Sequence, residues 1–235
     1  MARDRSAKPD HGKADSGEPS KGKSPGAEKF LPERRGLSQL REAVQDCEGC
    51  DLYKRATQAV FGEGSAKARI MLVGEQPGDR EDVQGHPFVG PAGLLLDRAL
   101  KEAGIARGNV FVTNVVKHFK STPAPRGKKR IHSKPSAREM KACRPLLEAE
   151  LGLVKPVVLV LLGATAAQSL LEASFRVTKS RGKAIEGTRW AKYVVATVHP
   201  SSILRAPDDE ERHRQFAAFV KDLKVAAKAA KNQSL

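Results

Sequence analysis

The chain has 235 residues, and its 42 Lys and Arg outnumber its 27 Asp and Glu, which gives a formal net charge of +15. A chain this basic favours a polyanionic partner, and nucleic acid more than an anionic membrane surface. The sequence has no apolar run of roughly 18 residues that could cross a membrane, and its first residues lack the apolar core of a secretory signal. We therefore expect no membrane association and a cytoplasmic protein, in the bacterial cytosol or nucleoid.

Residues 1–35 are rich in Lys, Ser, Gly, Pro and Asp and contain almost no large apolar side chains. Such a segment cannot bury enough apolar surface to offset the entropy lost on ordering. We therefore predict a disordered tail over 1–35 and one folded domain over 36–232. The tail holds nine Lys and Arg against six Asp and Glu, a net charge of +3, so the remaining +12 belongs to the folded part.

From residue 36 onward, helical patterns alternate with short apolar runs. The first helical face carries Leu37, Leu40 and Val44. The apolar runs that we interpret as buried strands are 69–73, 110–114, 157–162 and 193–198. Further helices are expected from Pro91, from the capping-box residue Ser136, after Gly163 and from Asp208 to Lys231, with a short hairpin within 176–190. Strands that alternate with helices predict an α/β fold with parallel strands.

Two loops carry chemically useful side chains directly after predicted strands. The first, Gly74-Glu75-Gln76-Pro77-Gly78-Asp79, follows the strand 69–73, and the second, His199-Pro200-Ser201-Ser202, follows the strand 193–198. In an open α/β sheet, ligands bind at the edge where the strands end. The two loops therefore predict one shared pocket.

A strongly basic stretch lies between Glu102 and Glu139, which enclose nine Lys and Arg and no acidic residue. Five of the nine fall within 126–134, the segment that contains His132. Prolines at 123, 125 and 135 and the glycine at 127 favour a loop over a helix. A basic loop near the end of a strand suits contacts with phosphate groups.

The three cysteines are expected to be reduced thiols or metal ligands rather than disulfides, because three thiols cannot all pair within one chain and no export signal is present. Cys47 and Cys50 have the Cys-x-x-Cys spacing of a ligand pair, and Cys143 is the only other thiol. His118, after the second strand, is the candidate for a fourth ligand. A 4Fe-4S cluster is our first interpretation, and zinc held by three Cys and one His is the alternative.

Four segments, taken in order, resemble the uracil-DNA glycosylase superfamily, and its iron–sulfur branch in particular: 74–82, 85–93, 113–114 and 199–205. The basic segment 128–136 is similar to the extra loop of the X-type members of that branch. The resemblance covers roughly residues 36–232. It implies a three-layer α/β/α fold with a central four-stranded parallel sheet, and a monomer that acts on uracil-containing DNA, with single strands as the expected substrate. The branch uses four cysteines, and His118 stands at the position of the third ligand.

The resemblance also assigns roles in base recognition. Phe88 would stack on a uracil that has been flipped out of the DNA. Asn114 offers a donor and an acceptor that match uracil O4 and N3–H. His199 would hydrogen-bond uracil O2 and stabilise the negative charge on the departing base, while Gly74 and Gln76 would line the ring.

Further roles concern the sugar and the DNA backbone. Glu75 would orient a nucleophile or stabilise the cationic sugar, with Asp79 and Asp82 as weaker candidates. The DNA contacts would come from Lys128, Arg130, Ser201 and Arg205, with Arg130 also anchoring the basic loop. Ile203 or Leu204 would fill the gap left by the flipped base.

In X-type enzymes the histidine of the basic loop attacks C1′ of the deoxyribose once uracil has left. The resemblance therefore implies that His132 forms a stable covalent bond to DNA and that the protein does not turn over. Two alternatives stay open: a multiple-turnover glycosylase of the iron–sulfur branch, and a non-catalytic protein that binds uracil-DNA or single strands.

Overall fold

The computed structural model describes residues 25–34, 36–122 and 130–232. The disorder expected for residues 1–24 and the DNA contact expected for Lys128 fall outside these ranges. None of the described helices is long and apolar enough to cross a membrane.

The core of the fold is a sheet with the strand order β2-β1-β5-β7-β6. Its first four strands are mutually parallel: β2 (Val110–Asn114), β1 (Ile70–Gly74), β5 (Val158–Leu162) and β7 (Tyr193–Thr197). The predicted four-stranded parallel sheet is thus confirmed, with one addition. A fifth strand, β6 (Ala184–Glu186), pairs antiparallel with β7 at the edge, within the segment for which a hairpin is predicted.

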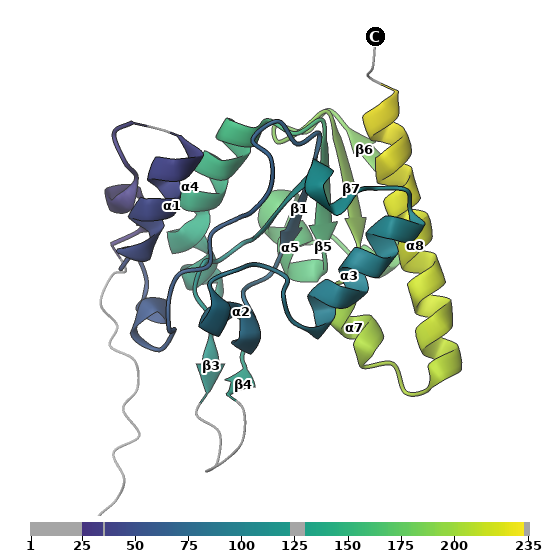
Figure 1. The fold of residues 1–235 in the computed structure, drawn as a ribbon, viewed down its shortest axis with the longest axis horizontal. Helices are drawn as coiled ribbons and strands as arrows, with labels where there is room; N and C mark the ends of the chain where they lie inside the picture. Colours follow the sequence, from purple (N-terminus) through teal and green to yellow (C-terminus); the bar gives the residue numbers. More distant parts are fainter. Residues whose placement is uncertain (1–24, 35, 123–129, 233–235) are drawn as a thin grey trace, which may run out of the picture.

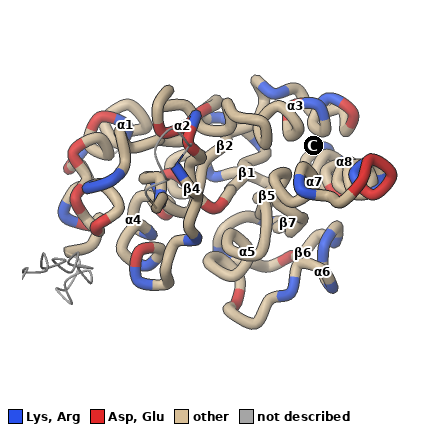
Figure 2. The backbone as a smooth tube through the Cα atoms, turned by 90° about the horizontal axis from the view of Figure 1, so that it is seen from below, with Lys and Arg blue, Asp and Glu red and all other residues tan. Residues whose placement is uncertain are grey.

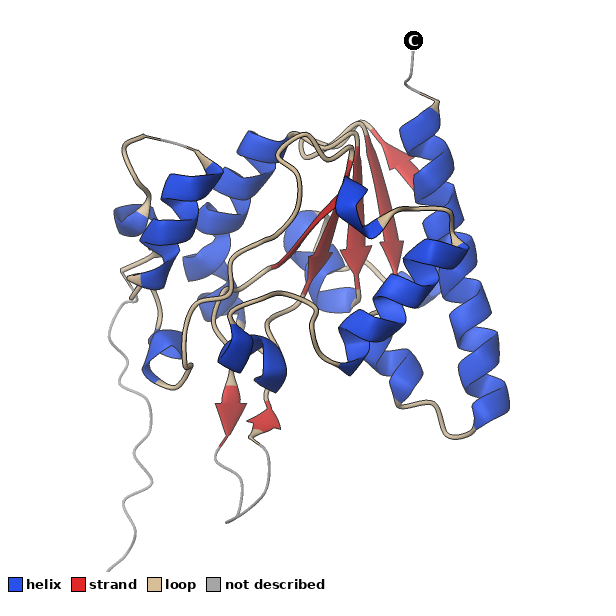
Figure 3. Ribbon diagram, in the orientation of Figure 1, coloured by secondary structure: helices blue, strands red, loops and turns tan. Residues whose placement is uncertain are grey.

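Helices cover both faces of the sheet and make three layers (Figures 1 and 3). One face packs against α1 (Leu37–Gln45), α4 (Ala137–Val154), α5 (Ala164–Leu170) and α6 (Val177–Ser180). The other packs against α3 (Pro91–Glu102), α7 (Pro200–Leu204) and α8 (Asp209–Lys231). Because successive side chains of a strand point to opposite faces, Met71 and Val73 enter the first core while Ile70 and Leu72 enter the second.

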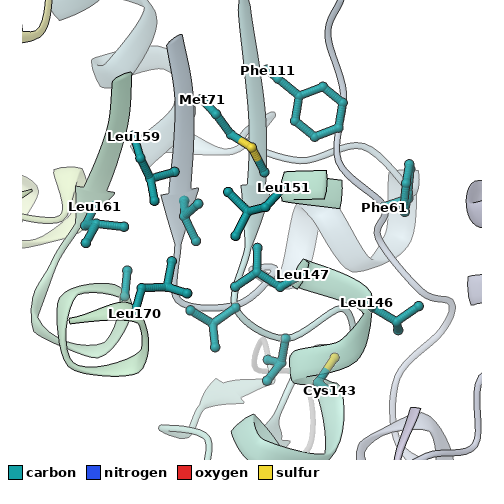
Figure 4. Close-up of a cluster of buried hydrophobic side chains, with 14 of the residues drawn as sticks. Phe61, Met71, Phe111, Cys143, Leu146, Leu147, Leu151, Leu159, Leu161 and Leu170 are labelled. Carbon is teal, nitrogen blue, oxygen red and sulfur yellow. The ribbon is translucent and has the colours of Figure 1, made fainter. Parts of the chain in front are cut away.

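The long helix α4 contributes side chains to the first core and carries the candidate ligand Cys143. Ser136 accepts a hydrogen bond from the Glu139 N–H, and the Glu139 carboxylate accepts one from the Ser136 N–H, so the predicted capping box is confirmed. Leu147 and Leu151 pack under the sheet, and Cys143 lies one turn before Leu147 on the same helix (Figure 4).

The folded part of the chain begins before the predicted boundary at residue 36. Ala27–Phe30 form the 3-10 helix η1, and Ala27 is fully buried against the core that contains α4. The Gly26 N–H donates to the Gly49 carbonyl, and a Cβ on Gly49 would lie 2.8 Å from the Ala27 nitrogen. Phe30 and Leu31 also pack against this core, partly buried, but three apolar side chains within a polar segment are too few to show a periodic pattern.

The parallel strands all end at one edge, which faces downward in Figure 1. The helix α2 (Asp79–Gln84), the helix α7 and a small antiparallel hairpin of β3 (Ser121–Thr122) and β4 (Ile131–His132) surround this edge. Figure 2 looks onto it and shows basic and acidic residues interspersed around the strand ends. The chain leaves β1 toward β2 on one side and later enters β5 on the other, so β1 and β5 flank a topological switch point.

Candidate active site

The side chains of Asn114 and Phe88 converge on Gly74, where β1 and β2 end, and they fit there because Gly74 has no side chain. A Cβ at Gly74 would collide with Asn114 Oδ1 and would lie 2.7 Å from Phe88 Cζ. Asn114 is almost fully buried, and its Oδ1 has no hydrogen-bond partner among the described residues. A buried acceptor without a donor costs free energy, so this oxygen is the candidate acceptor for a ligand N–H.

Phe88 is held against Gly74 by a backbone conformation that a bulky side chain rarely adopts. Its φ is 58°, in the left-handed region, and its ring centroid lies 6.1 Å from that of His199. The first turn of α3 supports this conformation, since a Cβ on Gly93 would overlap the Phe88 carbonyl oxygen. The Gly90 N–H, which donates to Glu81 Oε1 at 3.0 Å, ties the same loop to α2. Backbone strain maintained by such packing is typical of ligand clamps.

His199 presents a donor to the site because its other ring nitrogen is occupied. It is the N-cap of α7, and its Nδ1 accepts from the Ser201 N–H at 3.2 Å and lies 2.8 Å from Ser201 Oγ. An accepting Nδ1 leaves the proton of the neutral ring on Nε2. Burial, helped by the charges of Arg205 and His132, lowers the pKa of His199 to about 4. The neutral ring therefore persists at physiological pH and can stabilise a developing anion.

The depressed pKa of His199 predicts an acid-dependent loss of stability. The unfolded chain protonates this histidine near its usual pKa of about 6.5, whereas the folded protein resists protonation down to about pH 4. Stability from His199 is therefore present above pH 6.5 and is lost as the pH falls toward 4, by at most about 3 kcal/mol. Urea unfolding between pH 4 and 8 measures this loss. The free energy of unfolding should fall less between pH 8 and pH 4 in His199→Gln than in the wild type. Equal declines in the two proteins would contradict the depressed pKa of His199.

The hairpin β3–β4 brings His132 to the Gln76 side chain. Gln76 Oε1 accepts from the Lys120 N–H at 2.9 Å, which fixes the direction of the amide. Its NH2 group therefore faces Ser133 O at 2.9 Å and His132 Nε2 at 2.7 Å. Because an amide NH2 can only donate, Nε2 of His132 accepts and carries a lone pair. His132 thus presents an unprotonated ring nitrogen beside the loop that follows β1.

Glu75 connects this histidine to the end of β5. Its Oε1 lies 3.6 Å from His132 Nε2, and its Oε2 accepts a hydrogen bond from the Thr165 hydroxyl. Thr165 was not predicted as a site residue; it follows Gly163 at the start of α5, and nothing in the local pattern separates it from an ordinary helix residue. The carboxylate is fixed on one side and faces the imidazole on the other, which suits the stabilisation of a nearby cation.

Arg130 anchors the same hairpin, as the sequence suggested. Its guanidinium pairs with Asp79 at 2.7 Å and with the fully buried Asp82 at 2.7 Å, and it lies 5.2 Å from the centre of the Phe119 ring. The two aspartates, which were weak candidates for the site, belong to α2 and hold Arg130. The predicted DNA contact of Arg130 remains a proposal.

The loop after β7 places the other expected DNA contacts. Arg205 is exposed, whereas Ser201 is half-buried and bonded to His199. Of the two residues predicted to fill the gap of a flipped base, Ile203 is fully buried in the core with α3 and α8, while Leu204 is 37% exposed. The prediction for Ile203 is therefore wrong, because the turn of α7 points this side chain inward.

The three candidate thiol ligands belong to the first core, and His118 is buried in the loop after β2. Cys47, Cys50 and Cys143 are all buried, and the Lys117 N–H, adjacent to the buried His118, donates to Cys143 Sγ at 3.3 Å. Burial raises the pKa of Cys50 to about 11 and that of Cys143 to about 12, and each of these is raised further by the charge of Cys47. Burial likewise lowers the pKa of His118 to about 4.

This donor set can be tested against the expected cofactor. Within residues 25–34, 36–122 and 130–232, no three His, Cys, Asp or Glu converge as ligands of a single ion. A cubane cluster is bound by soft thiolate ligands spread around its four irons, and buried thiols need such a positive centre to ionise. Three thiols and one imidazole can serve as ligands of either a cluster or zinc.

Comparison with known proteins identifies the family to which the chain belongs. The sequence model of the uracil DNA glycosylase superfamily matches residues 61–224. The type-4 uracil-DNA glycosylase of Thermotoga maritima is 40% identical over 176 residues, covering 74% of this chain and 85% of that protein. The type-4 enzyme of Pyrobaculum aerophilum is 38% identical over 177 residues, covering 73% and 86% respectively. The chain belongs to the uracil DNA glycosylase superfamily.

Proposed function

We propose that the protein is a uracil-DNA glycosylase of the X type, which excises uracil and then bonds covalently to the DNA through His132. The observation that carries base recognition is the buried, unpartnered Oδ1 of Asn114 beside Gly74. Uracil and thymine each present a donor at N3–H, whereas N3 of cytosine is an acceptor. The Oδ1 acceptor of Asn114 therefore selects against cytosine. Phe88 lies at the same pocket and supplies the stacking surface.

Excision would begin when the nucleotide is flipped out of the stack and its ring enters this pocket, at a cost of a few kcal/mol. Asn114 reads N3–H and O4, and the Nε2–H of His199 donates to O2. The glycosidic bond then breaks with both electrons going to uracil, and the negative charge on the base is stabilised by His199. Because His199 stays neutral, its hydrogen bond strengthens as the charge develops.

Capture would follow at C1′, where the departure of uracil leaves a cationic sugar. The hydrogen bond from the Gln76 NH2 to His132 Nε2 would have to break, and the freed lone pair would form the new bond to C1′; the ring, now positively charged, can lose its Nδ1 proton. Glu75, 3.6 Å from Nε2, stabilises this positive charge. The hairpin holds the imidazole close to the sugar in advance, and this entropic advantage lets it compete with water.

A 4Fe-4S cluster would be held by Cys47, Cys50, Cys143 and His118, and it would cross-link the ends of α1 and α4 and the loop after β2. The relatives named above are type-4 enzymes, which supports this assignment. Purified protein should be brown, with iron and sulfide in equal amounts. A colourless protein that contains zinc would overturn the assignment.

One experiment separates the possible activities. The protein is incubated with a single-stranded or double-stranded oligonucleotide that contains one uracil, and with a matched thymine oligonucleotide as control, and the products are run on a denaturing gel. A heat- and detergent-resistant adduct with uracil alone, at no more than one per protein, supports the proposal. Abasic product in large molar excess indicates turnover, and binding without either product indicates a non-catalytic protein. The strand preference, the monomeric state and the expected cytoplasmic location remain predictions.

A further inference from the structure

A buried lysine lies between the candidate base pocket and the candidate cluster ligands, and the mechanism above does not use it. Lys117 has no exposed surface, although its charge made it part of the predicted basic stretch. Its Nζ donates to Thr113 Oγ1 at 2.7 Å, to the Asn114 carbonyl at 2.8 Å and to Glu150 Oε2 at 2.6 Å. Since an ammonium has three protons, every donor is used, and Lys117 cannot contact DNA.

The partner carboxylate is as fully enclosed as the lysine. Glu150 has no exposed surface, and besides Lys117 it accepts from the Thr113 hydroxyl at 2.8 Å and from the Gly62 N–H at 3.0 Å. A buried ion pair is costly to desolvate, and replacing one by apolar residues is often neutral or stabilising. The contribution of the Lys117–Glu150 pair to stability is therefore not a sufficient explanation for its presence at this place.

The contacts of Lys117 converge on the segment that carries Asn114. The ammonium holds the carbonyl of Asn114, and the next two N–H groups, of Val115 and Val116, donate to the carbonyls of Gly74 at 2.9 Å and Glu75 at 3.2 Å. The end of β2 is thereby locked to the loop that follows β1. At its own N–H, Lys117 donates to Cys143 Sγ, so the same turn also contacts a candidate cluster ligand.

We propose that Lys117 is a positioning residue for base recognition, which fixes the main chain of Asn114 so that its Oδ1 points at the uracil edge. The proposal rests on the uracil-excising function inferred above. Glu150 and Thr113 hold the ammonium in place, and the ammonium in turn sets the direction of the Asn114 peptide. A hydrogen-bonding pocket loses selectivity when its reading group moves, because the buried acceptor then fails to meet its donor.

The test compares two variants that both lack the Glu150 charge. Glu150→Gln keeps the Lys117 side chain and its bond to Asn114 but leaves the lysine without a counter-charge, whereas Lys117→Met/Glu150→Gln removes both members of the pair. The double variant should therefore melt no lower than the single one, with the same iron content. Its single-turnover uracil release should be about 10- to 100-fold slower, while its affinity for uracil-free DNA is unchanged. Equal rates of uracil release in the two variants would overturn the proposal.

A second readout does not depend on catalysis. The amide hydrogens of Val115 and Val116 should exchange faster in the double variant than in Glu150→Gln, because the turn is no longer fixed. If wild-type protein releases no uracil, the proposed function fails, and the exchange rates still test the role of Lys117. If the double variant does not fold, Thr113→Val removes one acceptor of the ammonium with little change of shape. It should then show slower release and faster exchange, and unchanged values would refute the proposal.

Discussion

The His132→Ala variant is expected to form no covalent adduct with uracil-containing DNA while it continues to release uracil. The ring that supplies the lone pair is lost, but Asn114 and His199, which bind the base and stabilise its charge, lie on other loops. Water then reaches C1′ and completes the reaction by hydrolysis. A denaturing gel for the adduct, together with alkaline cleavage of the abasic product, measures both outcomes.

The matched control for this experiment is His213→Ala, because His213 is an exposed histidine of α8. It should form the adduct at the rate of the wild type. An adduct that persists in His132→Ala would remove His132 from the role of nucleophile. Loss of both adduct and uracil release would mean instead that His132 acts in excision itself.

The Asn114→Ala variant is expected to lose uracil excision by about 100- to 1,000-fold. It removes one donor and one acceptor to the base, which corresponds to about 3–4 kcal/mol in the transition state. Stability should change little, since the side-chain oxygen has no described partner to lose. Single-turnover excision rates and thermal melting measure the two effects.

Asn109→Ala is the control for this substitution, because Asn109 is exposed just before the opposite end of the same strand. Its excision rate should equal that of the wild type. A rate for Asn114→Ala within a few-fold of the wild-type rate would show that the base is read elsewhere.

The order and type of the main elements could be predicted from local patterns. Continuous apolar runs bounded by turn residues indicated all four parallel strands, and the Ser136–Glu139 box marked the start of α4. What escaped prediction was short or polar. The strands β3 and β4 have two residues each. The helix α2 begins with acidic residues and has no apolar face that would mark it as a helix. Such elements exist because of contacts with distant segments, as Arg130 shows by joining β4 to α2.

The candidate site shows the same division between local and distant information. Asn114 ends a predicted strand, and Glu75, Gln76 and His199 stand within three residues after one, so the parallel sheet brings them to one edge. The hydrogen-bond partners of these side chains could not be predicted from the local sequence. Thr165 on Glu75, Ser201 on His199 and Lys120 on Gln76 became visible only when the loops were packed together.

By itself, the sequence determined the α/β fold, the residues at the strand ends and the candidate thiol ligands, because apolar periodicity and motif spacing are local properties of the chain. The tertiary structure alone decided which charged groups of the described residues are buried and which ring nitrogen of His132 and of His199 accepts a hydrogen bond. Lys117 and Lys120 stand three residues apart in the same basic stretch, yet the first is enclosed with Glu150 and the second pairs at the surface with Glu139. The burial of a charge depends on partners supplied by other elements, and those partners are fixed only when the helices pack on the sheet.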